Sequence, residues 1–188
     1  HVEDEIPKRE VARLRKEISE ISESDGPVPE DVGALTDAGN AERLAKRAHG
    51  RLVWIRDAEE WWAYNDARGT WEADKHGIRY RLALEAARAL GDHGHPAVSA
   101  WGKRSESRRA LDDALALLRT MPRMSPEMAV MDSNPTLLCC RSGVIDLETG
   151  ELSEHRADYY MSRRAEADYR AGARNGEWNA LIQWAMDD

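Results

Sequence analysis

Segment 135–160 constrains the fold most, because it predicts a strand, a turn and a hairpin in succession. Residues 136–140 are a short apolar run that is typical of a strand. Gly143 can take positive φ in the turn that follows, and residues 144–147 predict a second strand. Gly150 then marks the tight turn of a hairpin. The segment therefore predicts a small antiparallel β element, and it contains no arrangement of catalytic groups.

Two motifs stand out in the chain. The first is Leu-Thr-Asp-Ala-Gly-Asn-Ala-Glu-Arg-Leu at residues 35–44. The second starts with Pro-Thr-Leu-Leu at 135–138 and continues with Gly-Val-Ile-Asp-Leu-Glu-Thr-Gly-Glu-Leu at 143–152. His155 and the Asp158-Tyr159 pair complete it. Each motif alone is a weak signal, but their order and separation together are more specific.

Together these motifs resemble the region just upstream of the motor in phage and poxvirus primase-helicases, whose motor is a superfamily 3 ATPase. The resemblance extends from about residue 35 to the C-terminus, and Trp178 lies where that family has its closing helix. The chain departs from the family at Cys139 and Ser142, where an asparagine is usual.

The resemblance implies a non-catalytic module between a primase-polymerase part and a ring-forming motor. Such a module would brace neighbouring subunits as a collar and guide single-stranded DNA. ATP and Mg²⁺ are then expected only in the attached motor, which would begin soon after residue 188. The implied location is the cytoplasm of a bacterial host.

Periodicity predicts a mainly helical α+β fold with two small antiparallel β elements, at about 51–74 and 136–153. Expected helices cover 5–24, 37–48, 77–90, 97–121 (as one helix or two) and 177–186. The first β element should have strands at 52–55, 61–64 and 70–72. Its aromatic residues could stack nucleic-acid bases, but three strands need a buried face, which favours core positions for Trp54, Trp62, Tyr64 and Trp71.

The same patterns predict the domain organisation. Residues 1–24 are expected to form a helical arm, 25–32 a linker broken by proline and glycine, and 33–188 the domain itself. The arm has an apolar stripe at spacings of three and four residues. It could pack on the domain or on a neighbouring protein, or it could mediate self-association.

Composition limits the possible partners. The formal charge of −8 argues against a strongly basic DNA-binding protein, so DNA contacts must come from local basic patches or from a partner domain. The densest patch and a second basic pair are the candidate DNA-binding residues: Lys103, Arg104, Arg108 and Arg109, with Arg163 and Arg164. Arg43, Lys46 and Arg47 are expected on one exposed helix face, as solvated charges or as a phosphate contact. The chain has no apolar run near the roughly 20 residues of a membrane span.

Motifs of known chemistry are missing from the sequence. Lys103 follows Gly102, but no glycine lies at the start of a phosphate-binding loop and Arg104 replaces the hydroxyl residue. The adjacent Asp112 and Asp113 should diverge around a helix. The adjacent cysteines 139 and 140 should remain reduced. We therefore expect this chain not to be an enzyme and to bind no metal or cofactor.

The sequence leaves two alternative functions open. A stand-alone interaction or assembly protein could dock through the helix at 5–24. A small metal-dependent nuclease could use Asp92, His93 and His95, but zinc sites need three or four ligands and no further ones are apparent. A reading frame that continues beyond residue 188 into a phosphate-binding loop would favour the primase-helicase module.

Overall fold

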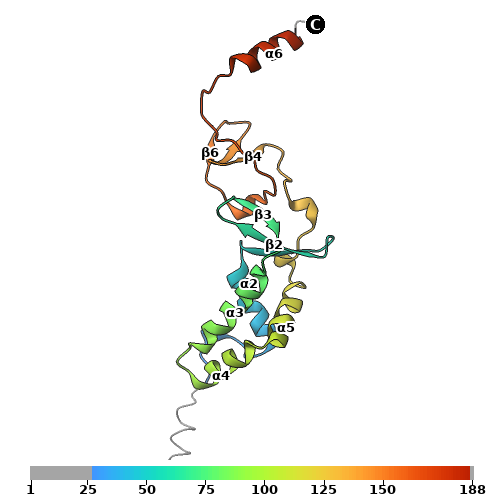
Figure 1. The fold of residues 1–188 in the computed structure, drawn as a ribbon. Helices are drawn as coiled ribbons and strands as arrows, with labels where there is room; N and C mark the ends of the chain where they lie inside the picture. Colours follow the sequence, from blue (N-terminus) through green and yellow to red (C-terminus); the bar gives the residue numbers. More distant parts are fainter. Residues whose placement is uncertain (1–26, 187–188) are drawn as a thin grey trace, which may run out of the picture.

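The computed structural model describes residues 27–186, so the predicted arm helix at 5–24 lies outside the described residues. Figure 1 shows an elongated arrangement, with four helices at one end, two small sheets beyond them and the last helix at the far end. The fold is mainly helical α+β, which confirms the predicted class. The elements in chain order are η1 (Glu30–Val32), α2 (Asp37–Ala48), β1 (Leu52–Ile55), β2 (Glu60–Asn65), β3 (Thr70–Ala73), α3 (Ile78–Gly91), α4 (Pro96–Ser105), α5 (Arg108–Leu118), η2 (Pro122–Met124), η3 (Met128–Val130), β4 (Leu137–Cys140), β5 (Gly143–Asp146), β6 (Leu152–Ser153), η4 (Ala157–Tyr159) and α6 (Gly176–Met186).

The motif at 35–44 starts α2. The hydroxyl of Thr36 accepts a hydrogen bond from the backbone N–H of Gly39 at 3.1 Å, as predicted for an N-cap. A Cβ on Gly39 would lie 2.0 Å from the carbonyl oxygen of Ala34, so no other residue fits there without a shift. Arg43 donates to the carbonyl oxygens of Val32 and Ala34, both at 2.9 Å. The motif thus fixes the path of the chain into the helix.

Asn40 of the same motif connects α2 to α4. Its side-chain amide donates to the hydroxyl of Ser105 at 3.0 Å. Its carbonyl oxygen accepts from the indole N–H of Trp101 at 3.0 Å and from Arg43 at 2.8 Å. Asn40 and Ser105 are both buried, so this small polar network has hydrogen-bond partners inside the helical end.

Residues 96–118 form two helices rather than one. Ser107 separates α4 from α5, and its hydroxyl caps α5 by accepting from the N–H of Ala110 at 3.3 Å. Helix α4 packs closely on α3, where a Cβ on Gly102 would lie only 2.2 Å from the backbone nitrogen of Gly91. The Gly102-Lys103 pair therefore belongs to a helix crossing, not to a phosphate-binding loop.

The first sheet, in strand order β1-β2-β3, has a hydrophobic cluster on each face. Trp61 and its neighbour Ala63 face the helices α2, α3 and α5, while Trp71 lies in the opposite cluster with Met131. Trp71 is 2% exposed, which confirms its predicted core position. Trp54, Trp62 and Tyr64 are only half-buried and pack against these clusters. Trp61, which was not among the predicted core residues, is buried instead.

The second sheet, β4-β5-β6, confirms the predicted β element. Gly143 has φ +146°, and a Cβ there would lie 2.2 Å from the carbonyl oxygen of Ser153. Strand β5 ends at Asp146, one residue before the predicted end, because the Asp146 carboxylate accepts from the N–H groups of Glu148 and Thr149 in the turn. Gly150 has φ +74°, as the predicted turn requires.

Within residues 27–186, every helix is too short or too polar to cross a lipid bilayer.

Candidate nucleic-acid interface

The break between α4 and α5 brings the densest cluster of cations together. Lys103 and Arg104 lie in the last turn of α4, and Arg108 and Arg109 in the first turn of α5. We call these four residues the basic corner. The side chains of Arg108 and Arg109 are 91% and 94% exposed. The fold therefore does not depend on burying these two guanidinium groups.

The acidic residues near the basic corner neutralise it only in part. Asp112 and Asp113 lie 3.7 Å from Arg108 and Arg109, respectively, one helical turn away. Exposed pairs of this kind contribute little, about 0.3–0.5 kcal/mol each. Glu106 pairs instead with Arg88 on α3, at 3.3 Å. The corner therefore keeps a local excess of positive charge on a chain of net charge −8.

Asp112 also accepts a hydrogen bond from the hydroxyl of Tyr80 at 2.6 Å, and this bond raises the pKa of Tyr80. The carboxylate of Asp112 is thus shared between a tyrosine on α3 and Arg108 on its own helix.

A surface hollow of about 300 Å³ lies beside the basic corner. Its lining includes Trp101, Arg104 and Arg109, together with the acidic Asp37 and Asp113. The guanidinium carbon of Arg104 lies 5.2 Å from the centre of the Trp101 ring, a cation–π contact. The hollow thus offers guanidinium donors for phosphate next to an aromatic side chain, a combination found where single strands bind.

Arg163 and Arg164 lie elsewhere, beside the two sheets. The side chain of Arg163 is 92% exposed, and its nearest carboxylate is that of Asp132 at 4.0 Å. Arg164 is 12% exposed and donates to the carbonyl oxygen of Arg68 at 3.3 Å and to Glu166 at 3.0 Å. The predicted DNA-binding residues therefore form two separate sets, and Arg164 has a structural role within its set.

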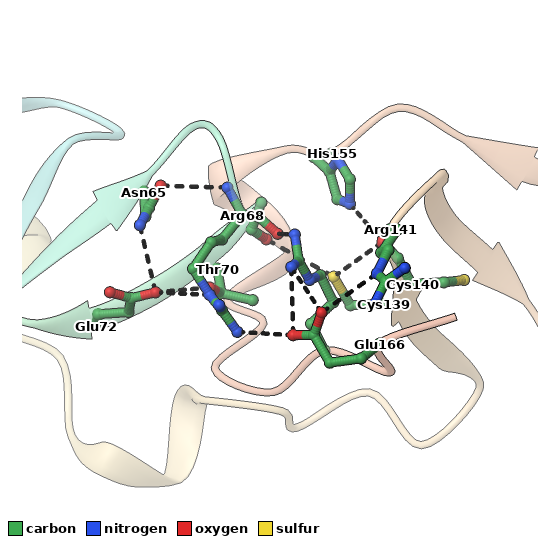
Figure 2. Close-up of polar contacts among 11 residues, drawn as sticks. Asn65, Arg68, Thr70, Glu72, Cys139, Cys140, Arg141, His155 and Glu166 are labelled. Atoms are coloured by element: carbon green, nitrogen blue, oxygen red, sulfur yellow. Dashed lines mark hydrogen bonds and ion pairs between the residues drawn. The ribbon is translucent and has the colours of Figure 1, made fainter. Parts of the chain in front are cut away.

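Arg164 belongs to a polar cluster that connects the two sheets, which we call the sheet junction. Figure 2 shows Arg68, Arg141 and Glu166 of this cluster. Its centre is Glu166, which accepts from Arg68 at 3.0 Å, from Arg164 at 3.0 Å and from Arg141 at 3.4 Å. These guanidinium groups, Arg164 first, hold the pKa of Glu166 below its usual range. The cluster connects the β2–β3 turn to the second sheet through side chains 25 to 98 residues apart in sequence.

His155 holds the other side of the sheet junction. Its Nε2 lies 2.8 Å from the carbonyl oxygen of Cys140, so the ring donates there when Nε2 carries the proton (Figure 2). The same ring covers the β2–β3 turn, where a Cβ on Gly69 would lie 2.1 Å from Cδ2 of His155. Cys139 is free and buried, and burial raises the pKa of its thiol. The histidine of the second motif is therefore a packing residue.

A comparison with protein families decides what kind of domain this is. The family described as "D5 N terminal like" matches residues 41–187. The chain belongs to the D5 N-terminal-like family. This domain is the N-terminal domain of primase-helicase proteins, which confirms the resemblance seen in the two motifs. A search of curated proteins gave no match.

In this D5 N-terminal-like domain, His93 and His95 belong to a turn. The Nδ1 atom of His93 accepts from the backbone N–H of His95 at 3.1 Å, and the hydroxyl of Ser99 donates to the carbonyl oxygen of His93. Across the described residues, no three His, Cys, Asp or Glu side chains are grouped so that they could hold a metal ion. The geometry therefore gives no support to a metal-dependent nuclease that uses Asp92 and these histidines.

One surface feature of the domain was missed from the sequence. A groove of about 660 Å³ lies between α2 and η2. We call it the Met groove, and it is lined by Ala45, Lys46, His49, Met121, Pro122, Arg123 and Met124. The sequence suggested only that Met121-Pro122 ends a helix, and it gave no signal that this segment lies beside the end of α2.

Proposed function

We propose that this D5 N-terminal-like domain is a non-catalytic module of a DNA replication primase-helicase, located between the primase part and a superfamily 3 motor. It would support assembly of the subunits into a ring and guide single-stranded DNA. Membership of the family supports the association with a primase-helicase. ATP and Mg²⁺ would act in the motor, and we assign no catalytic residue to residues 27–186.

The observation that carries the DNA-guiding role is the basic corner. Arg108 and Arg109 are more than nine-tenths exposed, and the ion pairs they make are long. Phosphates could displace such weak partners at little cost, because exposed pairs at this separation contribute only tenths of a kcal/mol. Trp101 beside Arg104 adds an aromatic surface on which a base could stack, worth about 1–3 kcal/mol in single-strand binders.

The net charge of −8 makes us expect only weak binding between the basic corner and single-stranded DNA. A small positive area on an acidic chain attracts a strand only at short range, since charges are screened beyond roughly 10 Å at 0.1 M salt. We therefore expect weak binding that depends strongly on salt and little on base sequence. Such binding suits a module that guides a strand held mainly by the motor.

Fluorescence anisotropy with a labelled oligo(dT) strand, measured over a series of salt concentrations, tests this role. Lys103→Ala/Arg104→Ala and Arg108→Ala/Arg109→Ala should each weaken binding and lower the salt slope by about 0.7 for each phosphate that the variant no longer neutralises. Arg170→Ala/Arg174→Ala is the matched control, because it removes the same charge from exposed positions of the connector before α6.

Arg163→Ala tests the second predicted patch separately, since Arg163 is exposed whereas Arg164 belongs to the sheet junction. Unchanged affinity and salt slope in both corner variants would end the DNA-guiding proposal. Equal losses in the corner variants and in the connector control would show that only net charge matters, which also contradicts a defined interface.

A further inference from the structure

Helix α6 carries the most exposed of the large apolar side chains in the described chain, Trp184 and Met186. It runs from Gly176 to Met186 at the far end of the molecule (Figure 1), and none of its residues is buried. Trp178, Leu181 and Ile182 are 59%, 52% and 40% exposed, and their spacing puts them on one face of the helix. The family match extends to residue 187, so α6 belongs to the domain.

A helix of this length needs a partner. Isolated helices shorter than roughly 12–15 residues are marginal in water, and α6 has 11 residues. Most helical stability in proteins comes from burial of an apolar face. Residues 27–186 do not bury this face, so the surface that covers it lies on another molecule or another segment.

The Met groove has the matching properties. Its floor includes Met121 and Met124, and methionine adapts its shape to an incoming side chain. Its rim carries Lys46 and Arg123, and neither forms an ion pair with another residue of the described part of the chain. The groove is therefore an apolar channel with an uncompensated positive rim.

Charge complementarity identifies the occupant. Residues 175–186 contain Glu177 but no lysine or arginine, so α6 offers a partner large apolar side chains, one carboxylate and no positive charge. Figure 1 shows α6 at the far end of the molecule, with both sheets between it and α2, which borders the Met groove. A helix from one copy reaching the groove of another satisfies both observations.

We propose that α6 of one copy docks into the Met groove of a second copy, with Trp178 and Ile182 on the groove floor and Glu177 near the positive rim formed by Lys46 and Arg123. Such a contact joins two different surfaces, so repetition of it closes a ring or extends a filament. The inference rests on the assembly part of the proposed function, for which it names the contact.

Sedimentation velocity of the full chain over a range of concentrations tests the proposal with two variants. The helix variant is Trp178→Ser/Ile182→Ser, and the groove variant is Lys46→Glu/Arg123→Glu. Both change residues that are exposed, so each should fold, which circular dichroism and the melting temperature verify. Each variant alone should associate at least tenfold more weakly than the unmodified chain.

An equimolar mixture of the two variants is the decisive sample. The groove variant keeps an intact helix and the helix variant keeps an intact groove, so the mixture should form dimers but nothing larger. Lys75→Glu/Arg81→Glu is the matched control, because it makes the same charge change at exposed residues away from the groove and should associate normally.

The possible failures are distinguishable. If the unmodified chain associates and neither variant weakens it, this contact is wrong while the assembly role stands. If both variants lose association and their mixture stays monomeric, the docking between copies is wrong. If the unmodified chain is monomeric at every concentration, the inference and the assembly part of the proposed function both fail, while the DNA-guiding part is unaffected.

Discussion

Substitution of Gly69 by alanine tests whether the sheet junction holds the two sheets together. Gly69 ends the β2–β3 turn with φ +70°, and a Cβ there would lie 2.1 Å from the ring of His155. Gly77 is a natural control, because it has φ +71° but a Cβ there would meet nothing within 4 Å. The two substitutions therefore have the same backbone cost and differ in the collision with His155.

The expected magnitudes follow from this comparison. Alanine in the left-handed region destabilises the folded state by about 1–2 kcal/mol. Alanine also lowers the conformational entropy of the unfolded chain, which offsets about 0.4–1 kcal/mol of this cost. Gly77→Ala should therefore lower the free energy of unfolding by about 1 kcal/mol. Gly69→Ala must also displace His155 from the buried Cys140 carbonyl group, which adds about 1–3 kcal/mol.

Urea unfolding followed by tryptophan fluorescence measures both values. At roughly 2–4 °C per kcal/mol for a chain of this size, the difference should also appear in the melting temperature. In a His155→Ala background the collision is gone, so Gly69→Ala should then cost only as much as Gly77→Ala. Equal effects of Gly69→Ala and Gly77→Ala in the unmodified chain would refute the role given to His155.

Three further predictions concern hydrogen-bonded and charged side chains. Asn40→Ala should lower the free energy of unfolding by about 2–3 kcal/mol, because the Trp101 indole and the Ser105 hydroxyl lose their partner; a change below about 0.5 kcal/mol in urea unfolding would contradict this. Arg164→Ala should cost about 1–2 kcal/mol, whereas Arg163→Ala should stay within about 0.5 kcal/mol, and equal melting temperatures would contradict the difference. The lowered pKa of Glu166 stabilises the fold above the unfolded-state value of 4.5 and stops doing so as pH falls through the lower folded-state value. The melting temperature should therefore fall less between pH 6 and 3 in Glu166→Gln than in the unmodified chain, and parallel curves would argue against the junction.

Features that depend on neighbouring residues could be predicted from the sequence. Thr36 caps α2 through a bond to a residue three positions away, and Gly150 has the positive φ that its hairpin requires. The two β elements and the helices after Gly77 follow from periodicity, since the pattern of apolar residues decides local structure. These parts needed no knowledge of which segments meet.

Features that depend on distant contacts could not be predicted. Alternation along β2 distinguishes Trp61 from Trp62 only once it is known which face the helices cover. Arg164 resembles a surface cation in sequence, and its partner Arg68 is 96 residues away. The Met groove likewise combines the end of α2 with η2, which no local pattern connects.

The family motifs and the proposed functional surfaces do not coincide. Asn40, Arg43, Gly143 and His155 belong to the motifs, and each is engaged in packing or in hydrogen bonds within the fold. The motif residues thus stabilise the fold. Substitutions at these positions would destabilise the protein, so they would not report on its function. The basic corner and the rim of the Met groove consist of exposed residues that take no part in those contacts. Substitutions there can therefore change DNA binding or association while the fold stays intact.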